Sequence, residues 1–288
     1  MSEHQNVAPA VVVGVDGSRA AIDAALWAVD EAVGRDIPLR LVYAIEPDEG
    51  RDTDSHDIAR KFAAAETAVR CAAVAVESTE KLVKIEAEIV RGRPINALLA
   101  ASRTAAMLCV GSVGLKHFHD GRIGSTASEL AAAAHCPVAV VRDADPVSSA
   151  QRWVAVVLDE AGGDAALRHG FDEARLRGTP LRVMAVWQSR YTDIHDDHAV
   201  TDGNRCVKAA LERRLELWRK NYPEIDVAAV ALHASPLRYL VKHSDSIQLL
   251  VVAHERGQGI KELLGAPGIA ALHHAKCSVL VSEPQNML

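Results

Sequence analysis

The chain has 288 residues, of which 49% are apolar and 4% aromatic, and it carries a net charge of −6. This length suggests two domains, because one domain commonly spans about 100–200 residues. The negative charge and the absence of a basic cluster exclude a duplex-binding surface, and no apolar run approaches the roughly 18–20 residues that a membrane helix needs. We expect a soluble cytoplasmic protein that binds neither nucleic acid nor a membrane.

Short β-branched runs alternate with longer helical patterns through the first half of the chain. The predicted strands are Ala10–Val15, Leu39–Ile45, Lys84–Val90, Ala106–Val110 and Pro137–Arg142. The predicted helices are Ser18–Val33, with Gly34 closing it, Asp57–Ser78, a helix from Pro94 to about Arg103, and Ser125–Ala134. This order is typical of an α/β fold in which helices cover both faces of a parallel sheet.

A polar segment, residues 143–151, interrupts this order, and the same pattern then begins again. The second set of predicted strands is Trp153–Leu158, Leu181–Trp187, Asp226–Leu232, Gln248–Ala253 and Val279–Ser282. The predicted helices are Gly163–Arg177, Thr201–Asn221, Pro236–His243 and Ile269–His274. Residues 143–151 are therefore predicted to be a linker, because they are polar and lack periodicity.

The two halves also repeat individual residues. Asp30-Glu31-Ala32 recurs as Asp172-Glu173-Ala174, and Pro38-Leu39-Arg40 recurs as Pro180-Leu181-Arg182. Each pair is 142 positions apart, as are Pro94 and Pro236. A constant offset over this length indicates duplication of a whole domain. We predict one domain over residues 1–145 and a second over residues 152–288.

Polar and glycine residues follow the predicted strands at the edge where parallel α/β sheets bind ligands. Asp16 comes after the first strand and is either an acceptor for a ribose or base or part of a helix N-cap. Gly111 and Gly114 follow the fourth strand, and after nine intervening residues Gly124-Ser125-Thr126 opens a helix. Glycines let the backbone approach a phosphate, and a helix N-terminus favours an anion.

Two basic residues, Lys116 and Arg122, lie between these glycines and are placed to counter phosphate charge. The alternative is a surface loop that leads into a hydroxyl-capped helix. The complete glycine and hydroxyl spacing favours the phosphate site over this alternative.

The pattern G-x-x-G, nine residues, then G-S/T resembles the nucleotide motif of the ATP-binding branch of the universal stress protein family. The chain matches it at Gly111, Gly114, Gly124 and Ser125, and it also matches the family's Asp after strand one at Asp16. The family's G-x-P corresponds to Gly92-Arg93-Pro94, and the strand end beside adenine corresponds to Tyr43-Ala44. The resemblance covers essentially the whole chain as two tandem copies.

This resemblance implies two Rossmann-like, adenine nucleotide α-hydrolase-like domains, each with a five-stranded parallel sheet in the order 3-2-1-4-5. It also implies pairing of last strands, here Val138–Val141 with Val279–Val281, or a homodimer. The implied cofactor is ATP, with or without Mg²⁺. The residues predicted to bind it are Asp16, Ala44, Val110, Gly111, Gly114, Lys116, Arg122, Gly124, Ser125 and Thr126.

The second copy departs from this motif. Asp159 matches Asp16, but Ala253 and Arg256 replace the first two glycines. Ala266 and Pro267 follow Gly265 in place of the two hydroxyl residues, and the proline lacks an N–H donor. We therefore predict one nucleotide site, in the first domain, and a degenerate second copy.

Neither a G-x-x-x-x-G-K-S/T loop nor a G-x-S-x-G elbow occurs, and no residue presents itself as a general base. Binding with slow or absent hydrolysis is therefore expected. We predict a nucleotide-dependent stress or dormancy regulator that acts on a regulatory protein partner. The alternatives are a slow ATPase or nucleotide-dependent enzyme, and a ligand-free interaction scaffold. No metal site is expected, because the five cysteines are scattered and the histidine clusters have no fixed third ligand.

Overall fold

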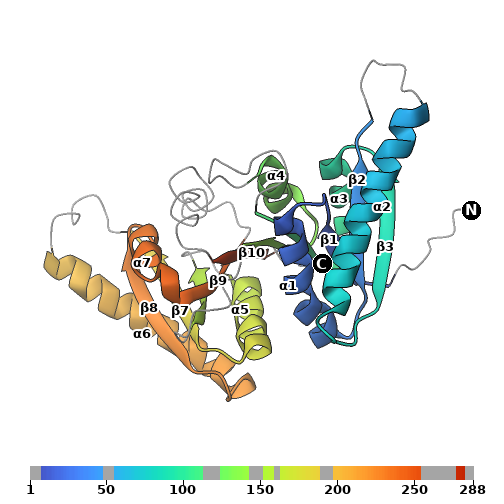
Figure 1. Cartoon of the computed structure of the whole chain (residues 1–288). Helices are drawn as coiled ribbons and strands as arrows, with labels where there is room; N and C mark the ends of the chain where they lie inside the picture. The colour runs from blue at the N-terminus through green and yellow to red at the C-terminus, as the bar shows by residue number, and fades with distance from the viewer. Residues whose placement is uncertain are drawn as a thin grey trace, which may run out of the picture. The chain divides into compact units, whose positions relative to one another are not determined.

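The computed structural model describes residues 8–47, 55–112, 124–142, 152–158, 163–188, 197–253 and 277–282. The chain separates into two compact units, Met1–Asp143 and Ala144–Leu288 (Figure 1). The first is called unit 1 and the second unit 2. None of the helices that the structure describes combines the length and the apolarity needed to cross a membrane.

Unit 1 alternates strands and helices along the chain. Its elements are β1 (Ala10–Gly14), α1 (Arg19–Arg35), β2 (Leu39–Ile45), α2 (Ser55–Glu77), β3 (Ile85–Arg91), α3 (Pro94–Ser102), β4 (Ala105–Gly111), α4 (Ser125–Ala133) and β5 (Val138–Val141). The strands are parallel and lie in the order β3-β2-β1-β4-β5. This confirms the predicted fold class and the strand order implied by the resemblance.

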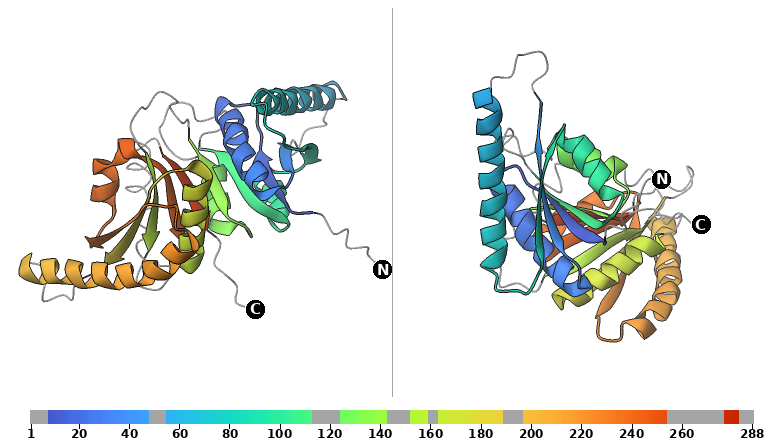
Figure 2. Two further views of the ribbon diagram at one scale, coloured as in Figure 1. Left: turned by 90° about the horizontal axis from the view of Figure 1, so that it is seen from below. Right: turned by 90° about the vertical axis from the view of Figure 1, so that its right-hand side faces the viewer.

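Small apolar residues explain how the helices of unit 1 cover its sheet. The α1 stripe that includes Ala21, Ala24, Ala28 and Ala32 is completely or almost completely buried, so this helix approaches the buried β1 closely. Helices α1 and α2 pack on one face of the sheet, whereas α3 and α4 pack on the other (Figure 2). The carboxyl ends of β1, β2 and β4 are left between these two layers, as expected for a ligand-binding edge.

Unit 2 repeats this arrangement. Its described elements are β6 (Trp153–Leu158), α5 (Asp164–Arg177), β7 (Leu181–Trp187), α6 (Asp197–Asn221), β8 (Val227–His233), α7 (Leu237–Lys242), the short 3-10 helix η1 (Ser244–Ser246), β9 (Ile247–Ala253) and β10 (Ser278–Ser282). The strands are parallel in the order β8-β7-β6-β9-β10, which is the order of unit 1. The predicted helix Ile269–His274 lies outside the described residues.

The predicted elements within the described residues are present, and their ends differ from the prediction by at most four residues. The predicted role of Gly34 is wrong, because α1 continues through it to Arg35. Asp36 adopts the left-handed conformation instead, with φ 53°, and its N–H donates to the carbonyls of Ala32 and Val33. Gly178, 142 positions later, ends α5 in the same way with φ 59°. Both helices thus end in a left-handed residue, the position that most often favours glycine.

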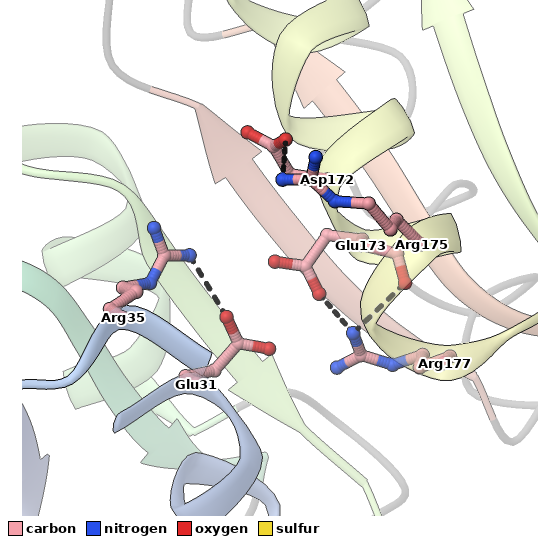
Figure 3. A network of polar contacts seen from close by, with 6 residues as sticks. All are labelled: Glu31, Arg35, Asp172, Glu173, Arg175 and Arg177. Carbon is pink, nitrogen blue, oxygen red and sulfur yellow. Dashed lines mark hydrogen bonds and ion pairs between the residues drawn. The ribbon is translucent and has the colours of Figure 1, made fainter. Parts of the chain in front are cut away.

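The duplication extends to buried polar contacts. The carboxylate of Glu31 on α1 is 1% exposed and accepts from Arg35 Nη2 at 2.9 Å. The equivalent Glu173 on α5 is also 1% exposed and pairs with Arg177 (Figure 3). A charged group that is buried this completely requires partners, because its transfer from water is costly. Each repeat therefore retains both members of its Glu–Arg pair.

Candidate functional site

A cavity of about 920 Å³ lies at the carboxyl ends of β1, β2 and β4 in unit 1. Of the ten residues predicted to bind nucleotide, seven line this cavity: Asp16, Ala44, Val110, Gly111, Gly124, Ser125 and Thr126. Ligand sites commonly have volumes of about 300–1,000 Å³, so the cavity is large enough for a nucleotide. The remaining three predicted residues, Gly114, Lys116 and Arg122, lie outside the described residues.

Asp16 was predicted either to accept hydrogen bonds from a ligand or to form part of a helix N-cap, and the hydrogen bonds of the turn after β1 bear on this choice. Its Oδ1 accepts the backbone N–H of Ser18 at 2.9 Å, across Gly17 with φ 85°. The N-cap of α1 is instead Ser18, whose Oγ accepts the N–H of Ala21 at 3.1 Å. Asp16 therefore stabilises the turn, as aspartate side chains often do, and its half-buried side chain also lines the cavity.

Gly111 is required by the packing of unit 1 itself. A Cβ at this position would lie 2.6 Å from the carbonyl carbon of Ala20 and 2.7 Å from its oxygen. These atoms belong to the backbone of the first turn of α1, so the contact cannot be relieved by a rotamer change. The close approach of β4 to α1 therefore gives this glycine a structural role in addition to the predicted one.

Helix α4 presents its N-terminus to the cavity. Its N-cap is Gly124, which has no side chain to accept the first free N–H groups of the helix. Gly124, Ser125, Thr126 and Ala127 all line the cavity. The free N–H groups and the positive end of the helix dipole favour an anion at this end.

Two cations that were absent from the predicted site also line the cavity. Lys61 belongs to α2, where its Nζ lies 3.7 Å from Asp57 Oδ2, and Arg93 is the N-cap of α3. Both are lost in unit 2, where the residues 142 positions later are Gly203 and Ser235. Lys61 and Arg93 are both replaced in the copy that has also lost motif glycines. This shared pattern of loss is the feature by which the sequence could have identified the two cations as part of the site.

Within the described ranges, no three His, Cys, Asp or Glu side chains are grouped closely enough to hold a metal ion. The cavity instead contains the carboxylates of Asp16 and Glu46 and the cations Lys61 and Arg93. Both signs of charge are therefore available to a ligand that carries an anionic group and neutral polar groups.

The equivalent region of unit 2 contains a large side chain. Trp187 ends β7 at the position equivalent to Ile45, and its Nε1 donates to Asn204 Oδ1 at 2.9 Å. Its ring lies 4.7 Å from that of His233, and a Cβ at Gly203 would lie 2.2 Å from its Cη2. The indole therefore packs directly on α6, where unit 1 has the cavity residues Ile45 and Lys61. Ala253, which is 6% exposed, stands at the position of Gly111.

We expect Gly203→Ala to lower the free energy of unfolding by about 1–2 kcal/mol, because the added methyl group displaces the indole of Trp187. Alanine is otherwise preferred over glycine within a helix by about 1 kcal/mol. In a Trp187→Ile background, which carries the unit 1 residue, the same substitution should therefore be neutral or stabilising. Urea unfolding of the four proteins of this cycle measures the coupling. An equal loss in both backgrounds would contradict the assigned contact.

Comparison with known proteins identifies the family. The profile described as "Universal stress protein family" matches residues 9–142 and again residues 151–282. The chain therefore belongs to the universal stress protein family, as a protein with two tandem domains, which confirms the resemblance inferred from the motif.

Its relatives include two proteins of Mycobacterium tuberculosis (strain ATCC 25618 / H37Rv). Universal stress protein Rv2028c is 44% identical over 279 residues, which cover 96% of this chain and 97% of that protein. Universal stress protein Rv3134c is 46% identical over 269 residues, which cover 92% and 95%. A solved universal stress protein from Archaeoglobus fulgidus DSM 4304 superposes with a TM-score of 0.69 at 17% identity, over 96% of this chain and 97% of that one. At this identity the structural comparison supports the fold alone.

Proposed function

We propose that unit 1 binds ATP, with or without Mg²⁺, and that the chain acts as a nucleotide-dependent regulator of a stress or dormancy response. The observation that carries this proposal is the single cavity lined by seven of the predicted residues. These residues come from β1, β2, β4 and α4, and they meet only in the folded unit. The proposed ligand would lie at the switch point of strand order, where α/β sheets bind nucleotides.

The lining suggests how the parts of ATP are held. The N-terminus of α4 and the hydroxyls of Ser125 and Thr126 supply neutral donors for phosphate oxygens. Lys61 and Arg93 add positive charge. The strand end at Ala44 and the carboxylate of Asp16 supply an apolar surface and an acceptor for the base and ribose. From the motif, we assign Gly114, Lys116 and Arg122 to the same phosphate site.

We further propose that only unit 1 binds the nucleotide. Unit 2 lacks the first two motif glycines and both cavity cations. The indole of Trp187 packs where unit 1 has cavity-lining residues. The chain should therefore bind one ATP. We propose that its effect reaches a protein partner through pairing of the last strands, Val138–Val141 with Val279–Val281, or through pairing of two chains. Since the motif supplies no dedicated general base, we propose that the effect follows from binding and not from turnover.

Calorimetry with ATP tests this proposal, together with Arg93→Ser, which installs the residue found in unit 2. We expect a stoichiometry of one per chain and a Kd raised about tenfold by the substitution, roughly 1.4 kcal/mol, because a cation facing the phosphates is lost. Arg103→Ser is the matched control, since this exposed arginine lies at the other end of α3 and should leave the Kd unchanged.

Other outcomes distinguish the remaining functions. Two equivalent sites per chain would contradict the proposed asymmetry between the units. Sustained Mg²⁺-dependent turnover would favour a slow ATPase. Failure of the folded protein to bind or co-purify with any nucleotide would favour an interaction scaffold.

A further inference from the structure

A second cavity, with a volume of about 550 Å³, lies in unit 2 between α5 and α6. It lies beside the last turns of α6, which lead into the start of β8, so it is at the opposite end of the sheet from the nucleotide-binding edge of the repeat. Its lining consists of Arg168, Arg175, Leu217, Trp218, Asn221 and Tyr222. Two arginines and two aromatic rings therefore face one space, and the described residues that line it include no carboxylate.

The two arginines make this cavity cationic. Arg175 pairs with Asp172 at 3.1 Å, and its guanidinium carbon lies 5.2 Å from the ring centroid of Tyr222. Arg168 is exposed and has no ion pair or hydrogen bond with any other residue that the structure describes. Burial, together with the hydrogen bond to Asp172, raises the pKa of Tyr222, while both arginines act in the opposite direction. Both arginines therefore lie close to Tyr222, as does the carboxylate of Asp172.

Trp218 and Tyr222 form the aromatic wall of the cavity, and both pack on the buried ring of Phe171. Phe171 is completely buried on α5, and its ring stacks on Trp218 with a centroid distance of 5.3 Å and an angle of 8°. It also lies 4.9 Å from the ring of Tyr222, whose hydroxyl donates to Asp172 at 2.9 Å. The rings of Trp218 and Tyr222 lie at 25° to each other with their centroids 6.2 Å apart, and rings held in this way favour stacking of a further planar ring.

The fold does not require these residues, because unit 1 lacks them. At the positions 142 residues earlier, unit 1 has Leu26, Val29, Val33, Val76 and Glu80 in place of Arg168, Phe171, Arg175, Trp218 and Tyr222. The helix pair of unit 1 is joined near this point by an ion pair between Asp30 and Lys81, whereas Asp172, the equivalent of Asp30, is joined to Tyr222. Unit 2 thus has arginines and aromatic rings where unit 1 has four aliphatic side chains, a glutamate and a nearby ion pair.

From these observations we infer that the cavity between α5 and α6 binds a small anion that carries a planar aromatic ring, such as an aryl phosphate or an aryl carboxylate. Arg168 and Arg175 would hold the anionic group, because guanidinium groups form charge-assisted hydrogen bonds with such anions. Trp218 and Tyr222 would contact the ring. The volume falls within the range of small-molecule sites. This inference is independent of nucleotide binding by unit 1.

Calorimetry with phenyl phosphate tests the inference on the full chain, with inorganic phosphate and phenol as single-group probes. We expect phenyl phosphate to bind more tightly than either probe. Arg168→Leu combined with Arg175→Val, which installs the residues of unit 1, should weaken its binding at least tenfold. Arg213→Leu is the matched control, because it removes an exposed arginine of α6 that does not line the cavity.

Two further measurements test whether phenyl phosphate binds in the cavity of unit 2 and not in that of unit 1. Phenyl phosphate should change tryptophan fluorescence in the wild type and much less in Trp218→Phe, and its affinity should be unchanged in Arg93→Ser, which alters the cavity of unit 1. Equal affinity for inorganic phosphate, or no effect of the double substitution in a protein whose circular dichroism is native, would overturn the inference. Tight binding of an acidic peptide without binding of phenyl phosphate would also overturn it, and would indicate a protein partner instead.

Discussion

Gly111→Ala is expected to lower the free energy of unfolding by about 3 kcal/mol and to weaken ATP binding at least about tenfold. The new Cβ would lie 2.6–2.8 Å from three atoms of Ala20, two of them in the backbone. The first turn of α1 must therefore move away from β4. Because Asp16 and Ser18 directly precede this turn and line the cavity, the site is displaced with it.

Urea unfolding and calorimetry with ATP measure the two effects of Gly111→Ala. The control is Ala253→Gly, the reverse change at the equivalent position of unit 2. It should cost no more than about 1 kcal/mol, as expected for the added backbone freedom, and should leave ATP affinity unchanged. Native affinity in a destabilised Gly111→Ala protein would show that the start of α1 takes no part in binding.

Phe171→Ala should lower the free energy of unfolding by about 3–5 kcal/mol, which is typical for removal of a buried aromatic ring. Phe171 is completely buried and stacks on Trp218 while also contacting Tyr222. Its loss leaves a cavity behind Trp218, on α6, and Tyr222, which directly follows α6. A loss of this size is a large part of the total stability of a typical domain, about 5–15 kcal/mol.

The matched control is Val29→Ala at the equivalent buried position of unit 1, where fewer carbon atoms are removed. We expect about 2 kcal/mol for this smaller side chain. Urea unfolding followed by tryptophan fluorescence compares the two, since Trp153, Trp187 and Trp218 report on unit 2 and Trp27 reports on unit 1. A loss below about 1 kcal/mol for Phe171→Ala would contradict its role as the support of the aromatic wall. Phenyl phosphate binding should also fall in this variant.

Much of the fold of each unit was predictable because its signals are local. Buried parallel strands appear as short β-branched runs, and proline at the start of α3 marks a helix beginning. The constant offset of 142 positions doubled this evidence, since each element could be checked against its copy. The end of α1 was placed wrongly at Gly34, because the left-handed residue there is Asp36, a less common choice than the Gly178 of unit 2.

The amino-acid sequence is sufficient to predict the duplicated α/β fold, the glycine and hydroxyl motif after β4, and the degeneration of that motif in the second copy. These features are carried by periodicity and spacing along a continuous stretch of chain. Three features become visible only in the folded chain: Lys61 and Arg93 line the cavity of unit 1, Gly203 accommodates Trp187, and arginines line the cavity between α5 and α6. Each of these depends on side chains from elements far apart in sequence, and their meeting is set by how helices pack on the sheet.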